Sequence, residues 1–107
     1  MNKITFTYDG TDYTLEFDRD SANRTALNGL DVCKLSGEQI MTGPTMIFEG
    51  ALFKHHGRLS KRKVEEIFDS FDEKTELIGA LTEMYAQAVE SVYSDGSGKT
   101  KWEVAGK

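Results

Sequence analysis

The chain has 107 residues, which is near the usual size of one domain and too short for two independent hydrophobic cores. Hydrophobic residues make up 38% and charged residues 29% of the chain, and the aromatic content is ordinary, so the composition excludes an intrinsically disordered protein. The net charge of -5 repels a phosphate backbone over most of the surface and disfavours nucleic acid as a partner.

Three features of the sequence predict a cytoplasmic protein without a membrane partner. Cys33 is the only cysteine, so no intramolecular disulfide can form. The hydrophilic start Met1-Asn2-Lys3 lacks the apolar region of a secretory signal. The longest apolar stretch, from Met46 to Phe53, is far shorter than the ~20 residues that span a bilayer.

Alternating apolar and polar residues over 3–8 and 12–17 predict two short strands joined at Asp9-Gly10. A two-residue type I′ turn at this dipeptide fixes the register of the resulting hairpin. On one face, that register pairs Phe6 with Tyr13 and Ile4 with Leu15. We expect this apolar face to be buried.

The same register pairs Lys3 with Glu16 and Thr5 with Thr14 on the opposite face. An ion pair and a pair of β-branched polar residues suit exposed cross-strand positions, so we expect this face to be wet. An isolated hairpin is only marginally stable in water, and the rest of the chain must therefore cover its apolar face.

Helical periodicity and boundary residues predict four helices, at about 20–28, 44–56, 60–71 and 73–94. Pro44 suits the first turn of the second helix, and Gly57 suits its end. The last two helices carry apolar stripes, formed by Val64, Ile67, Phe68 and Phe71 and by Leu77, Leu81, Met84, Tyr85, Ala88 and Val92. Residues 30–42 have no sustained period and indicate a loop, with a third short strand as the alternative.

The fold class that follows is α+β, with an N-terminal β-hairpin packed on a bundle of about four α-helices. The domain is predicted over residues 1–95, with the hairpin at 3–17. The Gly/Ser-rich connector near residue 96 predicts a flexible C-terminal tail over 96–107, with Trp102 either docking back or meeting a partner.

No motif in the sequence supports catalysis, a cofactor or a metal. Gly98-Lys99-Thr100 resembles the end of a phosphate-binding loop, but Tyr93 stands where that pattern requires glycine. His55 and His56 are adjacent on a helix and cannot chelate as an i, i+4 pair would. In the last turn of a helix, a partly protonated imidazole interacts favourably with the C-terminal carbonyls. A pH-sensitive contact is the alternative. We therefore expect a protein that is not an enzyme.

A basic cluster is the first candidate for partner binding. Arg58, Lys61, Arg62 and Lys63 lie around the start of the third predicted helix, where the helix dipole disfavours cations. Glutamates four residues after Lys61 and Arg62 compensate in part, which is typical of a solvated charged face. The alternative is a contact for an acidic partner or for a second copy of the chain, so a homo-oligomer remains open.

The apolar segment 46–53 is the second candidate. It is apolar almost all round, which is typical of a helix in the centre of a core. The alternative is a groove for a partner helix, lined by Ile47, Phe48, Leu52 and Phe53 together with Met84 and Tyr85.

The order of these elements resembles a family of small phage and prophage proteins of Gram-positive bacteria that are regarded as tail assembly chaperone-like. The resemblance rests on Ile4-Thr5-Phe6, Tyr13-Thr14-Leu15-Glu16-Phe17, the run from Phe48 to His56, Lys63-Val64 with Glu66-Ile67, and Leu81-Thr82-Glu83-Met84-Tyr85. It implies a factor of the bacterial host cytoplasm that binds the tape-measure protein and recruits tail-tube subunits during tail assembly. It implies no catalytic residues.

Two other functions are compatible with the sequence. One is a structural or joining phage protein that stays in the virion and pairs the free edge of the hairpin with a partner sheet. The other is a small nucleic-acid-linked regulator that places the basic cluster on phosphates.

Overall fold

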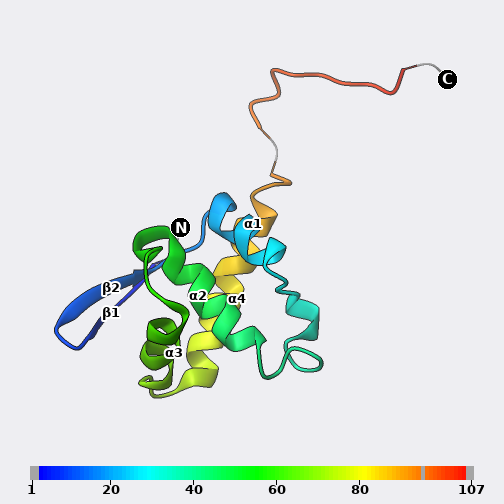
Figure 1. Cartoon of the computed structure of the whole chain (residues 1–107). Helices are drawn as coiled ribbons and strands as arrows, with labels where there is room; N and C mark the ends of the chain where they lie inside the picture. The colour runs from blue at the N-terminus through cyan, green and yellow to red at the C-terminus, as the bar shows by residue number, and fades with distance from the viewer. Residues whose placement is uncertain (1–2, 95, 106–107) are drawn as a thin grey trace.

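The computed structural model describes residues 3–94 and 96–105. Its elements in chain order are β1 (Ile4–Tyr8), β2 (Thr11–Leu15), α1 (Arg19–Leu27), a short 3-10 helix η1 (Val32–Lys34), α2 (Gly43–His56), α3 (Lys61–Asp69) and α4 (Lys74–Glu90). Within the described residues, an antiparallel hairpin followed by four α-helices confirms the predicted α+β class (Figure 1). Met1 and Asn2 of the predicted hydrophilic start, the domain end at 95 and residues 106 and 107 of the predicted tail lie outside the described residues.

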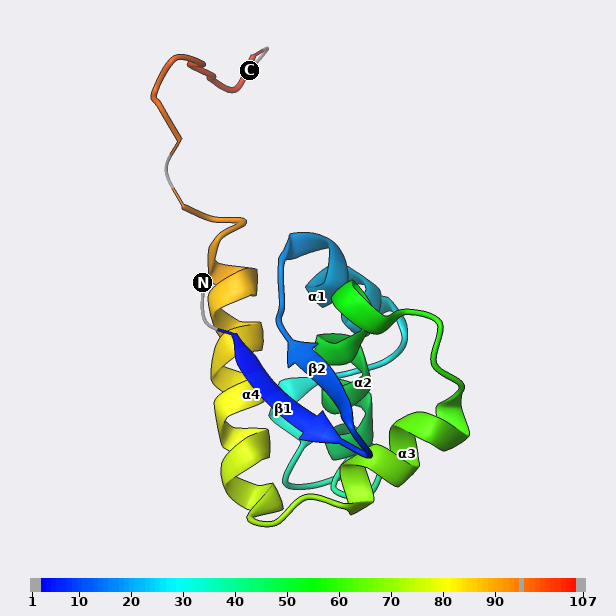
Figure 2. The same ribbon diagram turned by 90° about the vertical axis from the view of Figure 1, so that its left-hand side faces the viewer.

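The hairpin has the register that the sequence predicts. Asp9 and Gly10 have φ angles of 50° and 79°, as a type I′ turn requires. β1 and β2 pair antiparallel, with Ile4 opposite Leu15 and Phe6 opposite Tyr13. The rings of Phe6 and Tyr13 stack with centroids 5.3 Å apart. Figure 2 shows the hairpin lying against α2, with α4 beside β1.

The two edges of the hairpin have different surroundings. In this register the N–H groups of Thr14 and Glu16 point away from β1. They donate hydrogen bonds to α2, to Nε2 of His56 at 3.1 Å and to the carbonyl of Ala51 at 2.9 Å. The N–H groups of Thr5 and Thr7 point away from β2, and within the described residues they make no hydrogen bond to another element. β1 is therefore the open edge.

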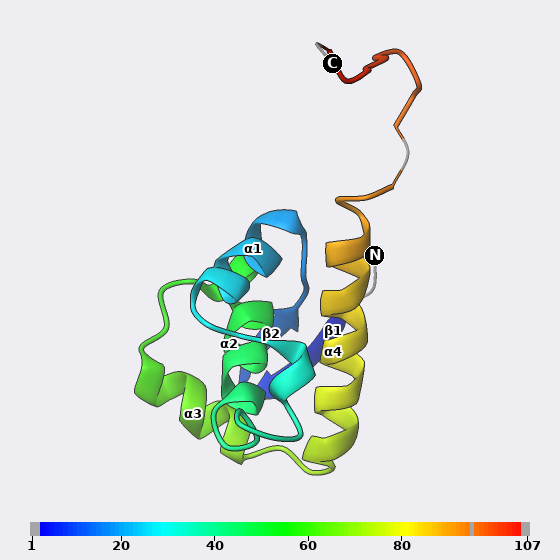
Figure 3. The same ribbon diagram turned by 90° about the vertical axis from the view of Figure 1, so that its right-hand side faces the viewer.

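Helix α2 lies at the centre of the core, as its apolar sequence predicts. Ile47, Phe48, Ala51 and Leu52 are at most 1% exposed. The ring of Phe48 packs against the rings of Phe6, Phe68 and Phe71, with centroids between 5.2 and 6.3 Å apart. Figure 3 shows α2 surrounded by α1, α3 and α4. Replacing such a buried phenylalanine with alanine costs about 3–5 kcal/mol.

Helix α1 begins at a pair of capping residues, Asp18 and Ser21. The carboxylate of Asp18 accepts a hydrogen bond from the N–H of Ser21 at 2.8 Å, and the hydroxyl of Ser21 accepts one from the N–H of Asp18 at 2.9 Å. This reciprocal capping box satisfies donors that the helix leaves unpaired. At the other end Gly29 has a φ of 112°, which suits glycine and reverses the chain into the loop.

Residues 30–42 contain turns and η1, which agrees with the predicted loop and not with its alternative, a third strand. The structure corrects two details of the fourth helix. At the start of α4, Asp72 has the side chain typical of a helix cap, but the cap is Glu73 in a left-handed conformation. Because α4 ends at Glu90, Val92 lies beyond the helical stripe and is 57% exposed.

Residues 96–105 form no helix or strand, and they extend away from the packed body (Figure 1). Trp102 and Val104 are 85% and 84% exposed. Among the described residues, no helix has the length and apolar character needed to cross a membrane.

Candidate functional site

The most concentrated set of charged contacts lies where β2 meets the C-terminal turn of α2. Oε1 of Glu16 lies 2.9 Å from Nε2 of His55, and Oε2 lies 3.2 Å from Nζ of Lys54. The same Nζ lies 3.6 Å from the carboxylate of Asp18. We call Glu16, Lys54, His55 and His56 the α2–β2 clamp, because His56 binds the same strand through the N–H of Thr14.

The clamp corrects the prediction that Glu16 is an exposed partner of Lys3. Glu16 is only 6% exposed, because α2 packs against this edge of the hairpin. The hydrogen bond from His55, with Lys54 alongside, lowers the pKa of the Glu16 carboxyl below its usual range. The hydrogen bond to Glu16 raises the pKa of Lys54. These groups therefore form an ion pair that attaches the hairpin to the helices.

His56 serves the clamp in its neutral form. Its Nε2 accepts the hydrogen bond from the Thr14 N–H, and its ring packs on Tyr13 with centroids 4.9 Å apart. Burial, and then the neighbouring His55, lower the pKa of His56 below its usual value. The two adjacent histidines thus hold Thr14 of β2 and Glu16 just after its end, a role that the helix-dipole argument did not identify.

The structure places most of the predicted apolar contact residues in the core. Ile47, Phe48, Leu52, Met84 and Tyr85 are at most 7% exposed. Phe53 is 38% exposed, and the guanidinium of Arg24 lies 3.8 Å from its ring centre. The hairpin and the other helices cover five of these six residues, so in the described part of the chain the six do not form the predicted groove.

Two grooves lie on either side of Met41, just before α2. One, of about 430 Å³, lies between α2 and α3, and the other, of about 370 Å³, lies between α2 and the start of α4. Met41 and Thr45 line both grooves. The other lining residues are Asn28, Thr42, Met46, Glu49, Lys61, Val64 and Glu65 in the first, and Ile40, Pro44, Phe68, Lys74, Thr75 and Ile78 in the second. We call the two grooves together the Met41 surface.

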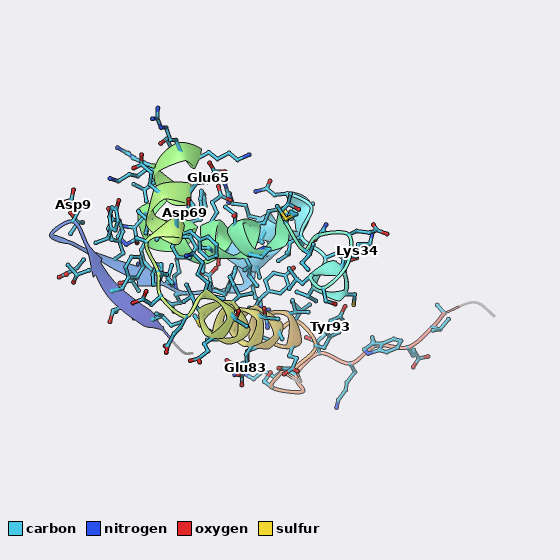
Figure 4. The ribbon with its side chains drawn as sticks, turned by 90° about the horizontal axis from the view of Figure 1, so that it is seen from below. Asp9, Lys34, Glu65, Asp69, Glu83 and Tyr93 are labelled. Atoms are coloured by element: carbon cyan, nitrogen blue, oxygen red, sulfur yellow. The ribbon has the colours of Figure 1, made fainter. Side chains whose placement is uncertain are left out.

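The Met41 surface combines exposed apolar atoms with charged rims. Met41 is 84% and Ile40 60% exposed, although neither is needed to fill the core. A methionine side chain is flexible and polarisable, so it adapts to partners of different shape. Figure 4 shows Glu65 projecting from α3 at the rim of the first groove, with α2 between α3 and α4.

The basic cluster is spread over several environments. Lys61 lines the first groove of the Met41 surface. Arg58 is exposed, and Arg62 is exposed with its Nε 3.9 Å from Glu66. Lys63 turns towards the hairpin, where its Nζ lies 5.2 Å from the ring centre of Tyr8. Of the ten residues predicted to bind a partner, Lys61 is therefore the one that the structure brings to the Met41 surface.

Sequence reasoning missed Ile40 and Met41 because they lie in a segment without a period. The signal that could have found them is an apolar pair between polar residues in a predicted loop. Among the described residues, no group of three or more His, Cys, Asp or Glu side chains could hold a metal ion, and Cys33 is an exposed free thiol.

A family described as a domain of unknown function, DUF5055, matches residues 1–106. The chain belongs to the DUF5055 family. The match includes the hairpin, all the described helices and the C-terminal segment 96–105. No curated protein and no solved structure matches the chain.

Proposed function

We propose that this DUF5055 protein is a phage tail assembly chaperone-like protein that binds the tape-measure protein, tail-tube subunits or both. The observation that carries the proposal is the Met41 surface, where two grooves meet at an exposed methionine. The likeness of the hairpin and of the run from Phe48 to His56 to small phage proteins adds support. The bound element in this proposal is an amphipathic helix of the partner.

The shape of the surface favours a helix over an extended peptide. A partner helix inserts apolar side chains at i, i+3, i+4 and i+7 into a groove. Here Met41 separates two adjoining hollows, so successive apolar side chains of one helix face can enter on both sides of it. Lys61, Glu49 and Glu65 provide charges of both signs at one rim, which can set the direction of the helix.

Co-expression tests this proposal. The chain is expressed with a candidate tape-measure protein, and the soluble yield and the co-purification of that protein are measured. Met41→Glu places a charge between the two grooves and should abolish the gain in soluble yield. Tyr93→Glu is the matched control, because Tyr93 is 83% exposed but lies at the other end of α4 (Figure 4). No gain with the unmodified chain, or equal loss with both variants, would contradict the proposal.

The open edge of β1 favours a second candidate, the joining protein that remains in the virion. Mass spectrometry of purified virions separates the two functions. A chaperone-like factor should be absent from the mature particle, whereas a joining protein should be present in a fixed ratio to the tail-tube protein.

A further inference from the structure

The open edge of β1 is a site that another strand can complete. The N–H groups of Thr5 and Thr7 point outward along this edge. Beside it lies a groove of about 270 Å³ between β1 and α4, lined by Lys3, Ile4, Ala80, Glu83 and Met84. An unpaired strand edge readily binds another extended chain, and most proteins cover or block such edges.

The C-terminal segment of the same sequence has the pattern of a missing strand. Thr100, Trp102 and Val104 alternate with Lys101 and Glu103. The first three are β-branched or aromatic residues, which are favoured in strands, and the other two are charged. Trp102 and Val104 are 85% and 84% exposed, so their apolar surface is uncovered in the single chain.

We infer that residues 99–104 of one copy add to the open edge of β1 in a second copy as a third, antiparallel strand. One register satisfies both chains. It places Glu103 opposite Lys3, Trp102 opposite Ile4, Lys101 opposite Thr5 and Lys99 opposite Thr7. The outward N–H groups of β1 then bond to the new strand, and Glu103 faces the opposite charge of Lys3.

The same register places the apolar side of the segment on the apolar side of the hairpin. Trp102 then lies beside Ile4, next to the groove that Met84 and Ala80 line. Charge also favours the contact, because two of the three charged residues in 99–104 are lysines whereas the whole chain carries a net charge of -5.

Chain direction favours a second copy over the same chain. The segment leaves the body at the end of α4, and the hairpin turn lies at the opposite end of the molecule (Figures 1 and 2). The antiparallel register needs Lys99 near that turn, so the same chain would have to cross its own body and reverse. A second copy supplies the strand in the required direction, either in one-way contacts or in a reciprocal exchange between two copies.

Trp102 is the only tryptophan, so its fluorescence reports directly on the segment. Gel filtration with light scattering measures the molar mass of the full chain at several concentrations. We expect this mass to rise above that of the monomer as the concentration increases. Over the same concentration range, Trp102 emission should shift to shorter wavelength, and quenching by acrylamide should fall at least twofold. A monomer with fully quenchable Trp102 at all concentrations would overturn the inference. So would Trp102 protected in the monomer, because that result places the segment on its own chain.

Two sets of variants locate the contact. Thr5→Pro removes one outward N–H and blocks strand addition, whereas Thr5→Val preserves that N–H. Of these two variants, we expect only Thr5→Pro to be monomeric. Circular dichroism checks that it folds. Glu103→Lys, in the exposed segment, should weaken self-association about fivefold, and combining it with Lys3→Glu should restore it. Self-association that is unaffected by Glu103→Lys, or not restored in the double variant, would overturn the proposed register.

Discussion

Lowering the pH from 7.5 to 5.5 should destabilise the protein through His56. The folded state holds this imidazole neutral, because Nε2 accepts the Thr14 N–H at 3.1 Å and the pKa of His56 lies below its usual value of 6.5. As the pH falls below 6.5, the unfolded chain binds a proton that the folded chain does not bind. Stability from this group is therefore complete above 6.5 and falls by up to about 1.4 kcal/mol per pH unit down to the lowered pKa.

Urea unfolding at several pH values measures this slope, and His56→Gln is the comparison variant. The glutamine cannot titrate, and its side-chain oxygen can still accept from Thr14. We expect a lower overall stability from the lost packing on Tyr13, but a flatter dependence on pH between 6.5 and 5.5. Parallel slopes for the two proteins, or a His56 pKa above 6.5 by NMR titration, would refute this account of the clamp.

Three further changes test the packing, the capping and the ion pair. Gly50→Ala should lower the free energy of unfolding in urea by about 1–3 kcal/mol, because the new Cβ would lie 2.1 Å from Oγ1 of Thr25. Gly79 in α4 has open space around it, so Gly79→Ala should raise the free energy of unfolding by about 0.5–1 kcal/mol. Equal effects would show that α1 and α2 are not in close contact. Asp18→Ala should cost about 1 kcal/mol by removing the cap of α1, and a negligible loss would contradict the capping box. Below pH 4.5, the usual pKa of a glutamate, the free energy of unfolding should fall further as Glu16 is protonated. In Glu16→Gln this further fall should be absent from urea unfolding curves measured at acidic pH.

Local rules determine much of the fold, and the sequence therefore predicted it. The two-residue loop at Asp9-Gly10 has the positive φ angles of a type I′ turn, which match the twist of the strands, so this turn fixed their register. The apolar run around Phe48 has no polar face, which indicated a helix buried on all sides. Helix ends were less accurate, as at α4, because apolar residues continued past the last turn.

The clamp and the Met41 surface depend on tertiary contacts and were not predictable in the same way. Glu16 occupies a position that alternation assigns to solvent, and its burial follows from Lys54 and His55 arriving from another element. Met41 lies between two grooves because α3 and α4 pack on either side of the start of α2. Neither relation leaves a period or a motif in the sequence.

Hydrogen–deuterium exchange tests the central claim most directly, with the full chain measured alone and with a purified helical segment of a candidate tape-measure protein. We predict slower exchange at the backbone amides of residues 40–46 and in the parts of α3 and α4 that line the Met41 surface. Exchange in the hairpin should not change. Slower exchange confined to the hairpin or to 96–105, or no change under conditions in which the two proteins co-purify, would contradict binding at the Met41 surface.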